Sequence, residues 1–239
     1  YYDTDGSGYP YANSVSTGST GTTYTLTGLS TGTLYYAAVA AVDSDGNESW
    51  VSSEVNGTAA STPKYLVLTA EPSNSTAGNP LAGQPVVRVT DLEGNLVTST
   101  SPSVTVSITS GSGTSGATLL GTTTVNAVDG VATFSDLQIN TAGADYTLTV
   151  SSSALIGVVS SGFDVAAGAA STLVVATNPS ESAANDIFST QPVVYITDGN
   201  GNIITAATGA VTAAIVSGLG TLTGTASVTA SSGVATFTG

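Results

Sequence analysis

The sequence predicts an all-β protein built from successive β-sandwiches. Runs of about four to eight residues rich in Val, Ile, Thr and Tyr alternate with clusters of Gly, Asn, Asp and Ser, which is the pattern of strands joined by short turns. No window keeps the i, i+3, i+4, i+7 apolar spacing of an amphipathic helix. The chain also repeats itself, since "QPVVRVTDLEGN" (84–95) returns as "QPVVYITDGNGN" (191–202). Turn signals at such close spacing are typical of β-sandwiches.

The expected strands follow the apolar runs in chain order. Each run carries β-branched or aromatic residues and ends near a turn-forming residue. Within the first copy of the repeat, Val87 and Val89 share one strand face, and Val86 and Arg88 share the other. The runs predicted as strands include Val86–Val89, Val104–Ile108, Val131–Phe134, Tyr146–Val150, Val193–Ile196 and Val234–Phe237.

The repeat also gives the domain length. Residues 84–87 return at 191–194, an offset of about 107 residues, which is the size of one immunoglobulin-like sandwich. The block "GVATF" (130–134) returns at 233–237, an offset of about 103, so the earlier copy carries about four extra residues. We place them in the Gly-rich tract 111–116, because loops absorb insertions at little cost.

The repeated strand is followed each time by a turn of the pattern Asp-x-x-Gly-Asn. Gly94 and Gly201 can supply the positive φ of a tight hairpin. The short stretches "STPK" (61–64) and "AAGAAS" (166–171) separate three predicted domains at 1–60, 64–167 and 171–239, here named the first, second and third segments. Because both linkers are short, we expect neighbouring segments to stack end to end with limited freedom.

The first segment resembles the C-terminal part of a fibronectin type III domain over residues 24–55. The strand-ending Leu, the Gly-Thr turn and the corner Tyr of that family match Leu29, Gly32–Thr33 and Tyr35. Thr31 stands where the family usually has Pro. Alternate residues of a strand share a face, so we assign to the core Tyr35, Ala37, Val39 and Ala41.

The second and third segments resemble the bacterial immunoglobulin-like repeats of surface proteins and invasin-type adhesins. The similarity lies in "TAEPSNSTAGNPLAGQPVVRVTDLEGNLV" (69–97) and "GTTTVNAVDGVATFSDLQINTAGADYTLTVSSS" (121–153). Residues 145–148 look like a tyrosine corner, in which a Tyr hydroxyl bonds to nearby backbone. The resemblance implies the fold and leaves function open, because such modules serve as spacers, anchors and binding heads.

Both terminal segments are expected to be incomplete sandwiches. The first lacks its opening strands, and the third stops at Gly239, where the second continues with "SDLQINTAGADYTLTV". Half a sandwich exposes apolar surface and unpaired strand edges. Two explanations stay open: the chain is an excerpt of a longer polypeptide, or a neighbouring subunit donates the missing strands.

The composition excludes several function classes. Two basic residues, Lys64 and Arg88, stand against 16 acidic ones, for a net charge of -14, which argues against nucleic-acid binding and against attraction to anionic membranes. No apolar run reaches the ~18 residues of a membrane span. Charged residues are 8% of the chain, far below the roughly 25% of an average domain, and a surface built from Ser, Thr, Asn and Gly is typical of extracellular β-proteins.

The chain is predicted to have no catalytic residues. It contains no His or Cys, so Ser–His and Cys–His nucleophile pairs are excluded and zinc lacks its usual ligands. The carboxylate pairs Asp3/Asp5, Asp43/Asp45 and Asp91/Glu93 all lie in turns, where a solvated role is expected. We expect no cofactor, with structural Ca²⁺ as the one candidate. The turns that could supply its oxygen ligands contain Asp43, Asp45, Asp91, Glu93 and Asp198.

Sugars could be attached to the chain covalently or be bound by its aromatic residues. Three Asn residues fit the N-glycosylation pattern, namely Asn47, Asn56 and Asn74. Separately, Tyr1, Tyr2, Tyr9 and Tyr11 form an aromatic cluster that either stacks on a partner or completes the core of its own domain.

The predicted function is a non-catalytic structural or adhesive module of a secreted or cell-surface prokaryotic protein, such as a surface layer, an extracellular filament or an adhesin stalk. The expected partners are other copies of the chain, neighbouring surface-protein modules or glycans, with no nucleic acid and no membrane insertion. The alternative is a set of accessory spacer modules from a secreted polysaccharide-degrading enzyme.

Overall fold

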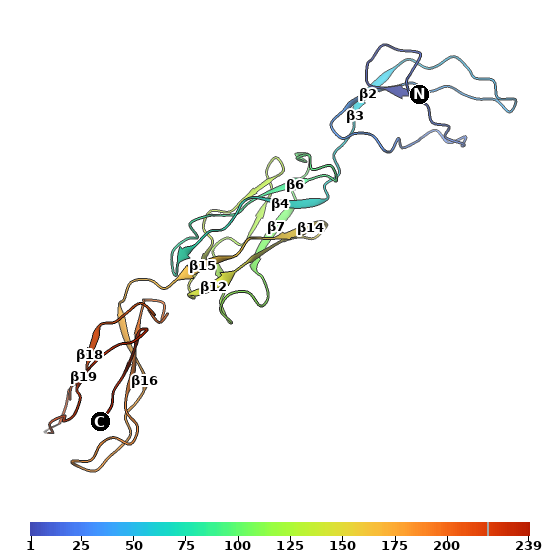
Figure 1. Ribbon diagram of the computed structural model, residues 1–239. Helices are drawn as coiled ribbons and strands as arrows, with labels where there is room; N and C mark the ends of the chain where they lie inside the picture. Colours follow the sequence, from blue (N-terminus) through green and yellow to red (C-terminus); the bar gives the residue numbers. More distant parts are fainter. Residues whose placement is uncertain (219) are drawn as a thin grey trace.

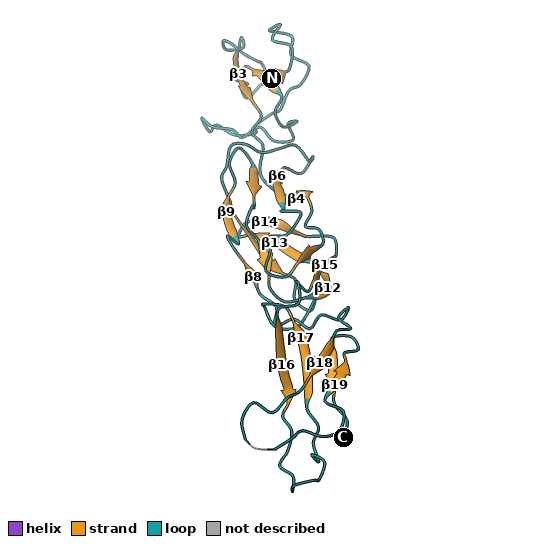
Figure 2. Ribbon diagram, turned by 90° about the vertical axis from the view of Figure 1, so that its left-hand side faces the viewer, coloured by secondary structure: helices purple, strands orange, loops and turns teal. Residues whose placement is uncertain are grey.

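The computed structural model describes residues 1–218 and 220–239. These residues form strands, turns and loops without any helix, which confirms the all-β class. None of them therefore forms a helix long and apolar enough to cross a membrane. Figures 1 and 2 show three groups of strands that follow one another along an elongated molecule. Every described strand pair joins partners within one segment.

The second segment is a two-layered sandwich. Its strands pair in one continuous order, β10-β6-β4-β14-β13-β7-β9, whose halves β10-β6-β4 and β14-β13-β7-β9 share one core and form the two layers. The two layers meet along one edge, where β14 and β4 run parallel through the pair Ile156 and Tyr65. The strands are β4 (Tyr65–Ala70), β6 (Val86–Thr90), β7 (Ser103–Ile108), β9 (Thr124–Asn126), β10 (Val131–Thr133), β13 (Leu148–Ser152) and β14 (Leu155–Val159).

Shorter strands close the ends of this sandwich. β8 (Leu119–Leu120) pairs with β11 (Gln138–Ile139). A further three-stranded sheet contains β12 (Gly143–Tyr146), β15 (Phe163–Ala166) and β5 (Ser75–Thr76). The core lies between the layers and takes alternate residues from each, including the fully buried Val87, Val89, Val104, Leu148 and Val150.

The predicted run 146–150 is wrong as a single strand. The chain leaves one sheet after Tyr146 and enters another at Leu148. Asp145 has a positive φ of 57°, a backbone conformation that redirects the chain at this point. The predicted tyrosine corner is confirmed, because the Tyr146 hydroxyl donates a hydrogen bond to the Thr141 carbonyl at 2.9 Å.

The third segment has a smaller core. Its sheets are β16-β17-β20 and β18-β19. The buried cluster draws on both sheets and includes Val194, Ile196, Val211, Ala235 and Phe237. The strands are β16 (Thr172–Thr177), β17 (Val193–Thr197), β18 (Ala210–Thr212), β19 (Ser227–Thr229) and β20 (Val234–Thr236).

The first segment corrects a prediction about its core. Its described residues form one sheet from β1 (Tyr2–Asp3), β2 (Leu34–Ala37) and β3 (Val55–Thr58). The face assigned to the core is largely open: Tyr35 and Ala37 are half-buried, Ala41 is exposed and Val39 is 72% exposed, whereas Ala38 is the buried residue. The reason is that no second described sheet covers this face.

Candidate functional site: the Asp-x-x-Gly-Asn turns

The turn of the third segment is built around the carboxylate of Asp198. Its Oδ1 accepts the backbone N–H groups of Asn200 and Asn202, both at 2.9 Å, and its Oδ2 accepts the Asn202 side-chain amide at 2.9 Å. The Gly201 N–H donates to the Asp198 carbonyl at 3.2 Å. Gly201 has a φ of 85°, as predicted, because the chain must reverse there. The side chain of one Asp thus organises the whole turn.

The same hydrogen bonds recur in the second segment. Asp91 Oδ1 accepts the N–H groups of Glu93 at 3.1 Å and Asn95 at 2.8 Å. Its Oδ2 accepts the Asn95 side-chain amide at 3.2 Å. Gly94 has a φ of 87°, which confirms the predicted hairpin glycine.

A third copy of the turn lies in the first segment, outside the stretch that repeats. Asp43 Oδ1 accepts the N–H groups of Asp45 and Asn47, both at 2.9 Å, and its Oδ2 accepts the Asn47 side-chain amide at 3.0 Å. The letters "DSDGN" (43–47) carry the same pattern as the two other turns. The pattern was therefore present in the sequence, outside the stretch that repeats.

The three turns differ in how far their Asp side chains are buried. Asp91 and Asp198 are each 2% exposed, whereas Asp43 is exposed. Asp198 Oδ2 also accepts the N–H of Gly168, in the linker that precedes the third segment, at 2.8 Å. The side chain of Thr31, from the first segment, lies near enough to Asp91 to contribute to lowering its pKa. The two buried turns thus lie where one segment meets the next.

Hydrogen bonding sets the charge state of these carboxyl groups. Burial alone would raise the pKa of Asp198, but the hydrogen bonds from Asn202, Gly168 and Asn200 outweigh it and lower the pKa. At Asp91, burial likewise acts to raise the pKa, and bonds from Asn95 and Glu93, together with the nearby Thr31 side chain, lower it. Both groups are therefore held as carboxylates at neutral pH.

These shifts predict acid-sensitive stability. A pKa that is lower in the folded chain stabilises the fold fully above the ordinary value of 3.8, and this contribution is lost as the pH falls through the lowered pKa. We expect the melting temperature to fall below about pH 4. Calorimetric scans between neutral pH and pH 2 would measure it. An Asp198→Asn variant should show a weaker acid dependence, and an unchanged profile would contradict this assignment.

The calcium candidates lie in these turns. The structure engages the oxygens of Asp43, Asp91 and Asp198 with donors of their own turns. Asp45 and Glu93 are exposed and contribute backbone N–H groups. Across residues 1–218 and 220–239, no three acidic side chains converge in a way that could hold a metal ion. The calcium expectation stays a prediction.

The glycosylation candidates are all exposed. The Asn47 amide donates within its turn, and Asn74 Oδ1 accepts the N–H of Asp164 at 2.8 Å. Asn56 lies on β3. Glycan attachment at these positions stays a prediction.

The predicted aromatic cluster forms in part within the first segment: Tyr1, Tyr9 and Tyr11 lie together, whereas the ring of Tyr2 lies 6.1 Å from that of Tyr35. The ring of Tyr1 lies 6.4 Å from that of Tyr9 and 6.3 Å from that of Tyr11. The hydroxyl of Tyr1 bonds to Glu48, and that of Tyr11 donates to Glu54 at 3.1 Å. These contacts tie the chain start to residues near β3.

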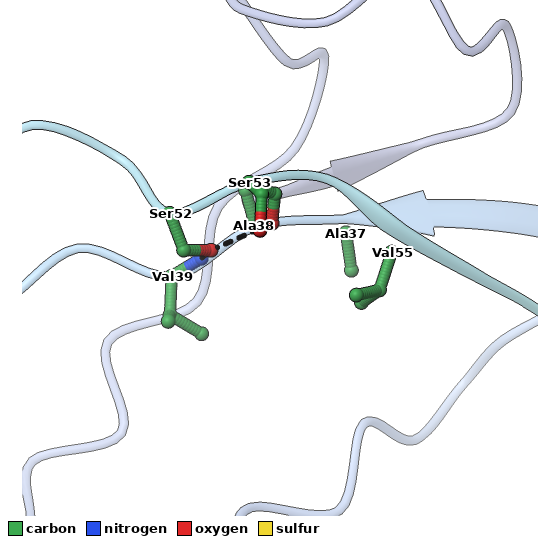
Figure 3. Close-up of a pocket in the computed structure, with 6 residues that line it drawn as sticks. All are labelled: Ala37, Ala38, Val39, Ser52, Ser53 and Val55. Carbon is green, nitrogen blue, oxygen red and sulfur yellow. Dashed lines mark hydrogen bonds between the residues drawn. The ribbon is translucent and has the colours of Figure 1, made fainter.

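A shallow pocket lies on the open face of the same segment (Figure 3). Val39, Ala37 and Val55 point to one side of the strand pair, and Ser52 Oγ accepts the N–H of Val39 at 3.1 Å. The lining is completed by Ala38 and Ser53. It contains no acid or base, so the pocket offers apolar contact and serine hydroxyls and no group that could transfer a proton at neutral pH.

Comparisons with known proteins give partial matches. No family model matches the chain, and the search of curated proteins found no match. Among solved structures, a β-glycosidase from Bacteroides vulgatus is 14% identical with a TM-score of 0.35, over 56% of this chain and 18% of that one. A glycosyl hydrolase family 2 member from Bacteroides cellulosilyticus is 14% identical with a TM-score of 0.33, over 56% and 17%. Domains 4–9 of surface layer protein SbsC are 19% identical with a TM-score of 0.32, over 80% and 32%. The chain spans less than a third of the length of each of these structures.

Proposed function

We propose that the chain is a non-catalytic structural or adhesive stretch of a secreted or cell-surface prokaryotic protein. The observation that carries this proposal is the end-to-end arrangement of its strand groups (Figures 1 and 2). At one contact between segments, the turn of Asp198 and Asn202 bonds to the second segment. Such an arrangement spans distance and transmits force. It suits a surface layer, a filament or a stalk.

The surface chemistry supports the same proposal. Charged residues are only 8% of the chain, and Cys and His are absent, so neither a thiol nor an imidazole is available for catalysis. The second segment reaches a fully buried core of Val, Leu, Ile and Tyr without disulfides. A module of this kind keeps its shape without a cofactor or a reducing environment. Its natural partners are neighbouring modules or other copies of the chain.

Small-angle X-ray scattering tests the rod shape. A compact protein of this length would have a radius of gyration of about 18 Å. We expect a clearly larger value, with a distance distribution that is long and asymmetric. A value near that of a compact globule would contradict the arrangement on which the proposal depends.

A binding assay tests the assignment of function. The purified chain is mixed with insoluble cellulose, chitin, xylan and peptidoglycan, and the bound fraction is measured after sedimentation. A cell-surface structural or adhesive stretch should stay in solution with cellulose, chitin and xylan, and retention on peptidoglycan alone would agree with a place at the cell surface. Saturable retention on a plant polysaccharide would instead support accessory modules of a degrading enzyme. Immunogold labelling of intact source cells tests the location of the protein. A cell-surface element should be labelled on the outside of the cells.

A further inference from the structure

We infer that the Asp-x-x-Gly-Asn turn of the third segment is a docking element that recognises the end of the second segment, with Asn202 as the recognising residue. The surface that it recognises is the end of the second segment. There the carbonyl of Asn140 and the N–H of Ala142 are two residues apart and lie near Gly78. This inference goes beyond the proposed function, since it concerns how one module binds another whatever the assembly is for.

The side-chain amide of Asn202 hydrogen-bonds to the second segment through both its nitrogen and its oxygen. Its Nδ2 donates to the carbonyl oxygen of Asn140 at 2.8 Å, and its Oδ1 accepts the N–H of Ala142 at 2.8 Å. A primary amide that pairs with one backbone C=O and one backbone N–H reads the main chain, as a neighbouring strand would, and not a side chain. Recognition of this kind depends on backbone geometry, so the Asn140–Ala142 stretch must be held in position.

The turn fixes the orientation of that amide. Asn202 Nδ2 also donates to Asp198 Oδ2 at 2.9 Å, so each of its two hydrogens has an acceptor. Asp198 is itself held by the linker, through the N–H of Gly168 at 2.8 Å. The side chain is therefore pre-oriented before docking, and little rotamer freedom is lost when the segments meet.

A glycine of the second segment permits the close approach. Gly78 has a φ of 80°, and a Cβ added there would lie 2.6 Å from Asn200 Nδ2. The Gly78 N–H donates to the Ile139 carbonyl at 3.2 Å, which ties this glycine to the stretch that Asn202 recognises. Figure 2 shows β12 and β15 at this end of the second segment, beside the third.

The homologous turn of the second segment shows that turn geometry alone does not bring the Asn side-chain amide onto the neighbouring segment. Asn95 makes the same bond to Asp91 at 3.2 Å, yet it is exposed, whereas Asn202 is half-buried. The two turns therefore differ in the surface that each Asn side chain faces, and not in their internal hydrogen bonds. This pair of turns supplies a matched control, because Asn95→Ala removes the same intra-turn bond without touching the contact to Ala142.

Amide hydrogen exchange of the full chain tests the proposal at the contact itself. In Asn202→Ala, the Ala142 N–H loses its acceptor, and we expect its exchange to accelerate by about tenfold, the change that corresponds to one hydrogen bond. In Asn95→Ala, Ala142 should exchange as in the wild type. Equal protection of Ala142 in both variants would overturn the proposal.

A second variant approaches the contact from the other side and leaves the turn intact. Gly78→Ala places a methyl group against Asn200, while Gly116→Ala imposes the same backbone strain, at a φ of 82°, with no atom within 4 Å. The chain has no Cys, so spin labels can be placed at exposed positions by Ser153→Cys and Thr225→Cys. We expect Gly78→Ala to broaden the label distance distribution severalfold and Gly116→Ala to leave it narrow. The Asn200 amide is the end of an exposed side chain and can move away from one methyl group, so Gly78→Leu is measured beside Gly78→Ala. If both variants keep the wild-type width, docking through this surface is disproved, even where Asn202→Ala unfolds the third segment.

Discussion

Replacing Tyr146 with Ala is expected to lower the free energy of unfolding of the second segment by about 3–5 kcal/mol, the cost of removing a large aromatic side chain from a packed core. The Tyr146 ring is fully buried and lies 6.0 Å from the ring of Phe163. A Cβ on Gly113 would lie only 2.2 Å from the same ring, so the loop packs directly on it. Truncation therefore opens a cavity between the loop and the sheet.

Two variants separate the contributions to this loss. Tyr146→Phe keeps the ring and removes only the hydroxyl bond to Thr141, which should cost about 1 kcal/mol. Tyr24→Ala truncates a tyrosine that is 55% exposed and should change stability little. Calorimetry, with hydrogen exchange of β13 to assign the transition, gives the three values. Equal losses in Tyr146→Ala and Tyr24→Ala would show that Tyr146 is not a core residue.

Strand and turn positions could be predicted from the sequence where the determining interactions are local. Val87 and Val89 are fully buried because the two-residue period of a strand places them on the same face, toward the core. Gly94 and Gly201 adopt positive φ because the turn after the strand requires it. Both signals lie within a few residues of the feature that they determine.

Predictions failed where the outcome depends on distant residues. The face of Val39 has the alternation of a core strand, but burial needs a second layer, and the described residues supply none there. The contact between Asn202 and Asn140 joins residues 62 positions apart. Asn95 and Asn202 occupy equivalent places in the repeat, so the sequence alone gives no reason to expect that only one of them meets the preceding segment.

Replacing Asp198 with Ala is expected to produce the second large effect, a loss of about 2–3 kcal/mol in the stability of the third segment, as for other hydrogen bonds to a charged group. The carboxylate is 2% exposed and accepts the N–H groups of Gly168, Asn200 and Asn202. Without it these donors lose their acceptor at a place that water reaches poorly. The Asn202 amide also loses the bond that orients it, so docking to the second segment should weaken in the same variant.

Asp43→Ala is the matched control, because it removes the same carboxylate from a turn of the same geometry that is exposed. Water can replace the lost acceptor there, so we expect no comparable loss of stability. Hydrogen exchange of β17 in Asp198→Ala, and of β2 in Asp43→Ala, measures the two effects separately. If both variants lose stability equally, the carboxylate acts only within its own turn. Burial of the Asp198 turn between segments then adds nothing to the stability of the third segment. A loss confined to Asp198→Ala shows instead that one turn motif has two energetic roles, set by whether another segment covers it.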